Sequence, residues 1–217
     1  MDMSKRVAII VLLILFIFAA LNFAFTFTQS KQLSKANELE TVDTLQNVEK
    51  VKNSISAEQG YLDYIVRDWA CWNDTYNFID DKNQNFVDIN VQNEILAGIK
   101  VNVMLFVNES GSVIYAKSID IDTAEETPVP KSLLRMVEDG TLLSKSESDT
   151  KSGFVFLDEN PMLISCHPIL TTDYTGPVRG TLIFGRYFDR NLKNSISKDT
   201  NSSLMIYKVG SDIPSDS

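Results

Sequence analysis

The first pattern along the chain is an uncharged apolar run, Val7–Phe27, which is interrupted mainly by Asn22, Thr26 and a few alanines. A helix of this length, ~20 residues, is what crosses the ~30 Å hydrocarbon core of a bilayer. We therefore predict a transmembrane helix over residues 7–27. A cleaved signal peptide is the alternative, but the apolar core of a signal peptide is usually shorter, about 7–15 residues.

Two basic residues, Lys5 and Arg6, come just before this run. Because basic residues beside a membrane span favour the cytoplasmic side, we predict that residues 1–6 are cytoplasmic and that the chain is extracellular from about Thr28 onward. The predicted location is the cell membrane, with a single pass in the chain as given.

A periodic pattern follows the apolar run. Between residues 28 and 60 there is no proline, and a line of positions from 41 to 69 alternates between spacings of four and three. The line includes Leu45, Val48 and Ile55, with polar interruptions at Thr41, Lys52 and Gln59. Such a pattern predicts a long helix and, more weakly, a two-stranded coiled coil. We expect a membrane-proximal stalk helix over residues 28–60 that joins a second copy into a homodimer.

An aromatic stripe comes next, in the sequence RDWACWNDTYNFI at Arg67–Ile79. At 100° per residue, its apolar side chains fall within one stripe about 100° wide. They are Leu62, Ile65, Trp69, Trp72, Tyr76 and Ile79. Asn73 and Asp74 compete for backbone hydrogen bonds, so the helix is expected to bend or restart there, with Asp74 as a candidate N-cap. The stripe is either a face packed on a sheet or, with its polar neighbours, the wall of a small pocket.

From residue 100 onward the pattern changes to β-rich runs bounded by turn residues. The predicted strands are Lys100–Asn108, Ser112–Lys117, Gly153–Leu157, Met162–Leu170 and Val178–Phe188, with one more at Ser203–Tyr207. A polar loop is predicted at Asp80–Asn85, and the ambiguous segment Phe86–Gly98 that follows it is expected to hold a short helix near Val91–Leu96. Two further helices are predicted, one from Pro130 through Val137 and one from a cap at Asp189 through Ile196. This order predicts an α+β fold, an antiparallel sheet with helices on one side. Residues 61–208 would form the folded domain and residues 209–217 a polar tail.

Composition narrows the classes of partner. The chain has 44% hydrophobic and 23% charged residues, which is typical of a globular protein, and a formal net charge of −9. This acidity argues against nucleic acid or an anionic membrane surface as a partner, because either would favour a basic patch.

The cysteines and the single histidine indicate no metal centre. Cys71 and Cys166 lie far apart in the sequence, and they could form one disulfide or remain two buried thiols. His167 follows Cys166 directly, so on a strand the two side chains point to opposite faces, and the spacing matches no zinc pattern. We predict neither a metal nor another cofactor.

Alternation on the last strands suggests further site residues. Arg186 shares one strand face with Leu182 and Phe184, and His167 shares one with Leu163. Arg186 could hold a carboxylate or phosphate between aromatic walls, or could form a structural ion pair. The partners considered for that pair are Asp68, Asp74 and Asp189. Two tryptophans beside acids could instead hold a cationic ligand. The candidate ligand-binding residues are Trp69, Trp72, Asp74, Tyr76, His167 and Arg186.

The motifs DWA at residues 68–70 and WNDTY at residues 72–76 give the chain a resemblance to the fourth subclass of CHASE extracellular sensor domains. The second half agrees with it, through SCHPI at residues 165–169 and GRYFD at residues 185–189. The resemblance covers roughly Leu33–Tyr207. It implies a PAS-like or Cache-like sensor that lies between two membrane spans and usually feeds a histidine kinase or a cyclic-dinucleotide enzyme.

The chain departs from that pattern after Tyr207, where neither a second apolar run nor an output domain follows. Either it is a truncated portion of a receptor or it signals through a partner. The predicted function is therefore sensory input from a small ligand of unknown class, without enzymatic activity in the chain itself. A surface binding module without signalling output is the main alternative. A hydrolase that uses Asp68 and Asp74 as paired carboxylates is a weaker one.

Overall fold

The computed structural model describes residues 3–158, 160–208 and 210. The chain divides into two compact units, Met1–Lys50 and Val51–Ser217, and helix α1 (Met3–Ala70) contributes to both. The two units are considered separately below. Except for Gly210, the predicted polar tail lies outside the described residues.

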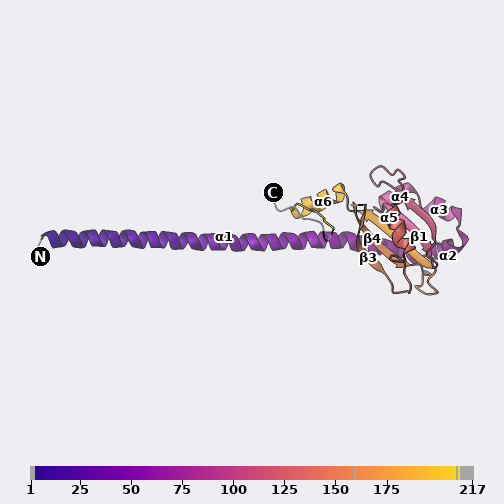
Figure 1. The fold of residues 1–217 in the computed structure, drawn as a ribbon, viewed down its shortest axis with the longest axis horizontal. Helices are drawn as coiled ribbons and strands as arrows, with labels where there is room; N and C mark the ends of the chain where they lie inside the picture. Colours follow the sequence, from indigo (N-terminus) through magenta and orange to yellow (C-terminus); the bar gives the residue numbers. More distant parts are fainter. Residues whose placement is uncertain (1–2, 159, 209, 211–217) are drawn as a thin grey trace. The chain divides into compact units, whose positions relative to one another are not determined.

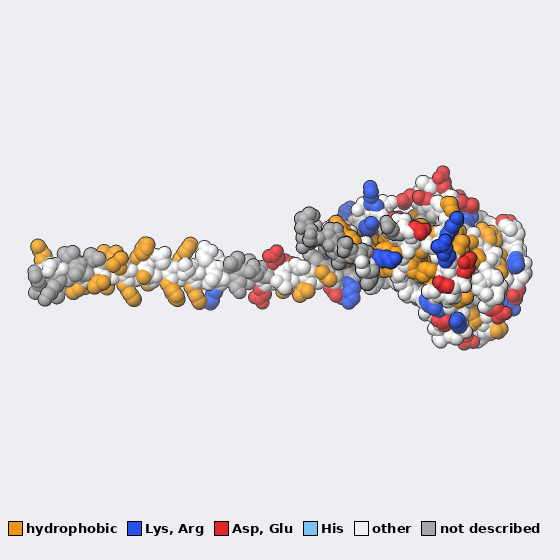
Figure 2. Space-filling view, in the orientation of Figure 1, with side chains coloured by type: hydrophobic (Ala, Val, Ile, Leu, Met, Phe, Trp, Pro, Cys, Tyr) orange, Lys and Arg blue, Asp and Glu red, His pale blue; other side chains and the backbone are white. Residues whose placement is uncertain are grey.

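The first unit is the N-terminal part of α1. Among the described residues, one helix segment is long and apolar enough to cross a membrane, Leu12–Gln32, and it overlaps the predicted span. Its apolar side chains are exposed, as Figure 2 shows along the helix. Two of its polar side chains bond within the helix, since Asn22 donates to the carbonyl of Phe18 and Thr26 to that of Asn22. Such internal bonds are what an apolar surrounding requires.

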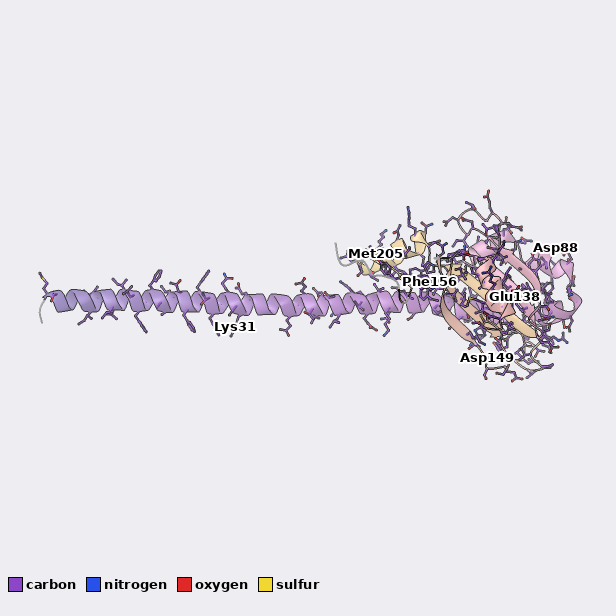
Figure 3. All side chains as sticks on the ribbon, viewed as in Figure 1. Lys31, Asp88, Glu138, Asp149, Phe156 and Met205 are labelled. Carbon is purple, nitrogen blue, oxygen red and sulfur yellow. The ribbon has the colours of Figure 1, made fainter. Side chains whose placement is uncertain are left out.

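Beyond this segment the same unit remains helical. At the end of the segment itself, Lys31, labelled in Figure 3, places its ammonium 5.0 Å from the centroid of the Phe27 ring. Leu45 and Val48, which belong to the predicted line of positions from 41 to 69, are 65% and 59% exposed. No helix break occurs at the predicted boundary between residues 27 and 28.

The second unit is built on one antiparallel sheet of five strands (Figure 1). The strands are β1 (Val103–Asn108), β2 (Val113–Ser118), β3 (Lys151–Leu157), β4 (Asn160–Pro168) and β5 (Gly180–Tyr187). Their order in the sheet is β2-β1-β5-β4-β3. This confirms the predicted α+β fold and the five main strands. The extra strand at Ser203–Tyr207 was wrong, because that segment forms no strand and instead packs Leu204 and Ile206 against the core.

Both faces of the sheet are covered. Side chains alternate along β1, so Met104 and Phe106 join one apolar cluster while Val103, Leu105 and Val107 join the other. The second cluster is closed by α5 (Lys131–Glu138) through Leu133 and Val137. The expectation of helices on one side only was therefore wrong. The physical reason is that β1 and β5 are apolar at consecutive positions, as strands buried on both faces are.

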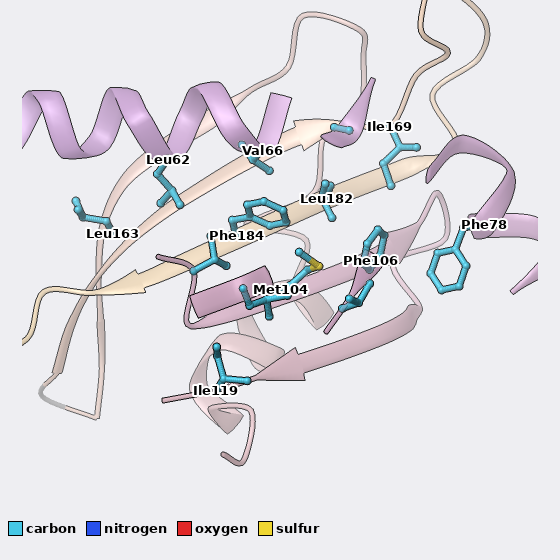
Figure 4. Close-up of a cluster of buried hydrophobic side chains, with 14 of the residues drawn as sticks. Leu62, Val66, Phe78, Met104, Phe106, Ile119, Leu163, Ile169, Leu182 and Phe184 are labelled. Carbon is cyan, nitrogen blue, oxygen red and sulfur yellow. The ribbon is translucent and has the colours of Figure 1, made fainter. Parts of the chain in front are cut away.

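The remaining helices cover the first face. They are α2 (Asn73–Asp81), α3 (Gln84–Asn90), α4 (Asn93–Gly98), α6 (Arg190–Thr200) and the end of α1. Figure 4 shows Leu62 and Val66 of α1 above Phe184 of β5. Helix α6 begins as predicted, because the Asp189 side chain accepts a hydrogen bond from the Leu192 amide.

Local predictions between α1 and β1 need correction. Asp74 is not an N-cap, because α2 already begins at Asn73 and Asp74 lies inside its first turn. The capping position is held by Trp72, which makes no side-chain capping bond. The predicted polar loop at Asp80–Asn85 is mostly helical, since α2 continues to Asp81 and α3 begins at Gln84. The short helix expected near Val91–Leu96 is confirmed as α4 at Asn93–Gly98, and α3 at Gln84–Asn90 is a further helix before it that was not expected.

Candidate functional site

The site begins where α1 gives way to α2. Helix α1 ends at Ala70 and α2 starts at Asn73, so the predicted restart is confirmed. The loop after β4 holds this junction in place, because Thr172 and Asn73 bond reciprocally. The Asn73 amide donates to Thr172 Oγ1 at 3.2 Å, and the Thr172 amide donates to Asn73 Oδ1 at 3.0 Å. These bonds fix the direction in which the flanking tryptophans project.

A pocket of about 370 Å³ opens at this junction, and we name it the aromatic pocket. Its lining residues come from the end of α1, the junction, α3, α4 and the loop after β4: Asp68, Trp69, Cys71, Trp72, Asn90, Ile95 and Thr172. Its volume lies in the range of sites for small molecules, about 300–1,000 Å³. Both tryptophans of the chain therefore line one pocket.

The two indole rings form a corner. Their centroids are 6.3 Å apart and their planes meet at 74°. Trp69 also packs edge-on against Phe184 in the core, and Trp72 tilts against Phe86 of α3. Trp69 is half-buried, whereas Trp72 is 38% exposed. The corner thus has one fixed wall and one wall open to solvent.

The polar groups of the aromatic pocket include donors, such as the two indole N–H groups, as well as acceptors. In the described part of the chain, Asp68 forms neither a hydrogen bond nor an ion pair. Asn90 donates its amide N–H to the Phe86 carbonyl, which leaves Oδ1 as an acceptor. Burial raises the pKa of the Cys71 thiol; the Arg67 charge lowers it and the Asp68 charge raises it, and the net shift is upward. Cys71 is therefore a neutral thiol near neutral pH.

Asp74 lines a neighbouring hollow of about 450 Å³ rather than the aromatic pocket. Trp72 and Asn90 belong to both, so the two hollows flank the same indole. Asp81 also lines the second hollow. Because Asp68 and Asp74 line different hollows, the structure does not bring them to one pocket as paired carboxylates.

Tyr76 lies outside both hollows and connects α2 to the loop before β5. Its hydroxyl donates to the Pro177 carbonyl at 3.2 Å. The guanidinium carbon of Arg179 lies 3.8 Å from the centroid of the Tyr76 ring, and Arg179 also donates to the Tyr76 carbonyl and pairs with Asp80. Tyr76 is buried, and these contacts are structural.

Arg186 is engaged by α1. Its guanidinium pairs with the Glu58 carboxylate, not with Asp68, Asp74 or Asp189 as the sequence suggested. Arg186 is only 7% exposed, and its Nε has no hydrogen-bond partner among the described residues. Glu58 was missed because its proximity to β5 depends on how α1 docks on the sheet.

His167 also meets α1. Its Nε2 lies 2.9 Å from Oδ1 of Asp63, and the Ser165 hydroxyl donates to the same oxygen at 2.7 Å. One turn earlier, Gln59 Nε2 donates to the Ile164 carbonyl at 3.0 Å. With the Glu58–Arg186 pair, these contacts form what we name the polar row between α1 and the sheet. The row joins α1 to β4 and β5.

The structure thus divides the six predicted site residues into three groups. Trp69 and Trp72 share a pocket, Asp74 borders the hollow beside it, and Tyr76, His167 and Arg186 make internal contacts. Arg186 also lines, with Glu58, a separate hollow of about 370 Å³. Five pocket residues are absent from the predicted site: Asp68, Cys71, Asn90, Ile95 and Thr172. Asp68 and Cys71 stand beside the predicted tryptophans in the sequence, whereas the other three have no stronger sequence signal than any helix or loop residue.

The structure decides between a disulfide and two buried thiols, the two possibilities that the sequence left open for the cysteines. Cys71 and Cys166 are both free and both buried. Among the described residues, no group of three or more His, Cys, Asp or Glu side chains is arranged to hold a metal ion.

Comparisons with known proteins show the family to which this domain belongs. The CHASE4 domain family matches residues 54–207. The methanogenesis regulatory histidine kinase FilI of Methanothrix harundinacea (strain 6Ac) is 30% identical over 165 residues, which cover 76% of this chain and 19% of that protein. The chain therefore spans about a fifth of that relative's length.

A solved structure supports the fold. The extracellular domain of vpHK1S-Z8, which is assigned as a histidine kinase, superposes with a TM-score of 0.55 at 16% sequence identity. The alignment covers 74% of this chain and 62% of that chain. The chain belongs to the CHASE4 family and carries a sensory domain homologous to the sensor domains of histidine kinases.

Proposed function

We propose that this chain is the extracellular signal-input part of a membrane receptor. A small ligand binds in the aromatic pocket, and the resulting change in the packing of α1 is passed across the membrane to a histidine kinase or a cyclic-dinucleotide enzyme. The N-terminus is cytoplasmic and residues after the apolar segment are extracellular. The domain itself performs no catalysis.

One observation carries this proposal: the aromatic pocket is lined by Asp68 and Trp69, which belong to α1, and by residues of α3, α4 and the loop after β4. A ligand that contacts both sides stabilises one arrangement of α1 against the rest of the domain. Because α1 is one helix from Met3 to Ala70 and includes the apolar segment, it is the natural route for the signal.

The polar row supplies the element that can change. Apolar contacts such as Leu62 on Phe184 tolerate small shifts, whereas the contacts of Glu58, Gln59 and Asp63 are directional. A displacement of α1 along the sheet would exchange these bonds as a set. Two arrangements of similar energy are sufficient for a ligand to shift the population between them.

A homodimer completes the proposal. Leu45 and Val48 of the predicted line of positions from 41 to 69, and Leu39 and Val42 beside that line, are each more than 40% exposed, which leaves an apolar stripe on α1. A second copy of the same helix would cover this stripe as a coiled coil, with movement of one α1 against the other as the output.

The experiment uses the full chain in lipid nanodiscs with a library of small acids, amines and sugars. A compound at a hundred times its dissociation constant should stabilise the domain by ~2.7 kcal/mol in thermal unfolding. Hydrogen exchange of the α1 amides over residues 51–70 is then compared with and without the compound. We expect Trp72→Leu to abolish the shift and Tyr61→Leu to preserve it, because Tyr61 is a similarly exposed aromatic residue that lines none of the described pockets.

The outcomes separate the alternatives. Binding that changes exchange in α1 supports a sensor. Binding at Trp72 with unchanged exchange in α1 would favour a surface binding module without signalling output. If no class of compound stabilises the chain, the aromatic pocket is not a ligand site and the proposal fails.

A further inference from the structure

We infer that the ligand of the aromatic pocket is a small organic ammonium ion. This inference rests on the proposed function, because it names the chemical class that the same pocket would take.

The charge of the pocket is the first argument. Of its described lining residues, Asp68 is acidic and none is a lysine or an arginine. Arg67 is the preceding residue, but its guanidinium carbon lies 6.0 Å from the Tyr64 ring centroid, one turn back along α1. A carboxylate or phosphate ligand would therefore meet Asp68 without a lining cation to compensate.

The availability of Asp68 is the second argument. Its carboxylate has no hydrogen bond or ion pair within the described chain, in contrast to Glu58 and Asp63 on the same helix. Those two side chains hold α1 to the sheet, whereas Asp68 has no such structural task. Its charge is free for a ligand.

The aromatic corner is the third argument. Indole faces attract ammonium ions through the negative charge of the ring face, and tryptophan is the best of the aromatic residues for this contact. The planes of Trp69 and Trp72 meet at 74°, so an ion placed in the corner can contact the face of one ring while it lies beside the other ring. Methylated ammonium groups suit this arrangement, because their surface is apolar while their charge is intact.

The acidic hollow beside the pocket adds to the same field. Asp74 and Asp81 line it, and Trp72 separates it from the aromatic pocket. In both hollows the described lining contains no lysine or arginine. The charged side chains that line the two sides of Trp72 are therefore carboxylates, which attract a cation, while the Arg67 charge acts on Cys71 from outside the lining.

The experiment titrates the full chain in nanodiscs with choline, tetramethylammonium and the neutral isostere of choline, 3,3-dimethylbutan-1-ol. Intrinsic fluorescence is the readout, because both tryptophans of the chain line the pocket. Glycine betaine, which adds a carboxylate to the same ammonium group, tests tolerance of an anion. We expect saturable changes with choline and tetramethylammonium, and at least tenfold weaker binding of the neutral isostere and of betaine.

Two variants with the same change of charge sharpen the test. Asp68→Asn should weaken choline binding at least tenfold without lowering the thermal midpoint, because Asp68 forms no hydrogen bond or ion pair with the residues that the structure describes. Asp199→Asn on α6, which lines none of the described pockets, should leave binding unchanged. Trp72→Phe should weaken binding less than Trp72→Leu does.

Equal binding of choline and its neutral isostere, or full binding to Asp68→Asn, would overturn the assignment. If an acid or a sugar binds instead and Trp72→Leu abolishes that binding, the ligand class is wrong while the sensory pocket stands. If neither ammonium compounds nor the wider library alters the fluorescence, the inference and the proposed function fail together.

Discussion

Asp63 of α1 and His167 of β4, which are 104 residues apart in the sequence, lie 2.9 Å apart between Oδ1 and Nε2. The Ser165 hydroxyl bonds to the same carboxylate oxygen. Burial alone would raise the pKa of Asp63, but the hydrogen bonds from His167 and Ser165 and the charges of His167 and Arg67 together lower it. The ionised carboxylate is thus the form that holds α1 to β4.

The first prediction concerns pH. Because the pKa of Asp63 is lower in the folded chain than its ordinary value of 3.8, this contact stabilises the fold above that value and is lost as pH falls through the lower folded pKa. Asp63→Asn should reduce the unfolding free energy near neutral pH by ~1–2 kcal/mol, as expected for a bond to a charged acceptor. Chemical denaturation across a pH series measures the difference between the parent and the variant.

That difference should shrink at acidic pH, where Asp63 is protonated in both folded and unfolded chains. Asp68→Asn is the matched control, because its carboxylate lies on the same helix without a partner. A difference for Asp63→Asn that stays constant through acidic pH would contradict the role of the ionised carboxylate.

The second prediction compares two ion pairs. Glu58→Gln leaves the Arg186 guanidinium, which is 7% exposed, without its counter-charge, so we expect a loss of roughly 2 kcal/mol. Asp80→Asn breaks the pair with Arg179, where both side chains are far more exposed, and should cost less than about 1 kcal/mol. Urea denaturation of the two variants provides the test. Equal losses would show that burial of Arg186 does not determine the strength of its pair.

The third prediction uses two glycines. Gly180 at the start of β5 has a φ of +158°, and a Cβ there would lie 1.9 Å from the Val107 carbonyl oxygen. Gly180→Ala should therefore destabilise the sheet by ~3 kcal/mol or more. Gly60 in α1 has no neighbouring atom within 4 Å of its Cβ position, so Gly60→Ala should stabilise the chain by ~0.5–1 kcal/mol.

Thermal unfolding of the two alanine variants measures both effects, and their opposite signs are the distinguishing result. A Gly180→Ala variant as stable as the parent would mean that β1 and β5 do not approach as closely as the structure places them.

The fourth prediction concerns the thiols. Burial raises the pKa of Cys166 to about 12, and burial also raises that of Cys71, so neither is a thiolate in mildly alkaline buffer. Because the thiolate is the reactive form, iodoacetamide should modify neither cysteine in the folded chain and both in denaturant. Intact mass spectrometry counts the modifications. A native mass lower by two hydrogens, with no labelling in denaturant, would instead reveal a disulfide.

The five main strands could be predicted because each is a β-rich run that ends at turn residues. The turn at Ser110 and Gly111 closes the first hairpin, and Asp158 closes the second. Coverage of both faces was missed, although consecutive apolar residues in β1 and β5 contained the signal. The pairing of β1 with β5 could not be predicted, because no local property links Val103 to Gly185.

The site was predictable where it depends on neighbours in the sequence. Trp69 and Trp72 are three residues apart, and they remain together even though the helix ends between them. Arg186 and His167 were correctly placed on the sheet face that meets a helix, but their partners lie more than 100 residues earlier. Those partners depend on the position at which α1 docks, which is a tertiary property.

The strand order has a consequence for the assembly of the domain. Strand β5 lies between β1 and β4, so the hairpins β1–β2 and β3–β4 share no backbone hydrogen bonds with each other. Each hairpin pairs within a short stretch of chain, whereas β5 joins residues as distant as Val103 and Gly185. Before β5 has left the ribosome, the emerged chain therefore contains two separate hairpins with unpaired edges. The sheet becomes continuous only when its last strand is inserted in the middle, which makes late, slow folding the expected behaviour of this domain.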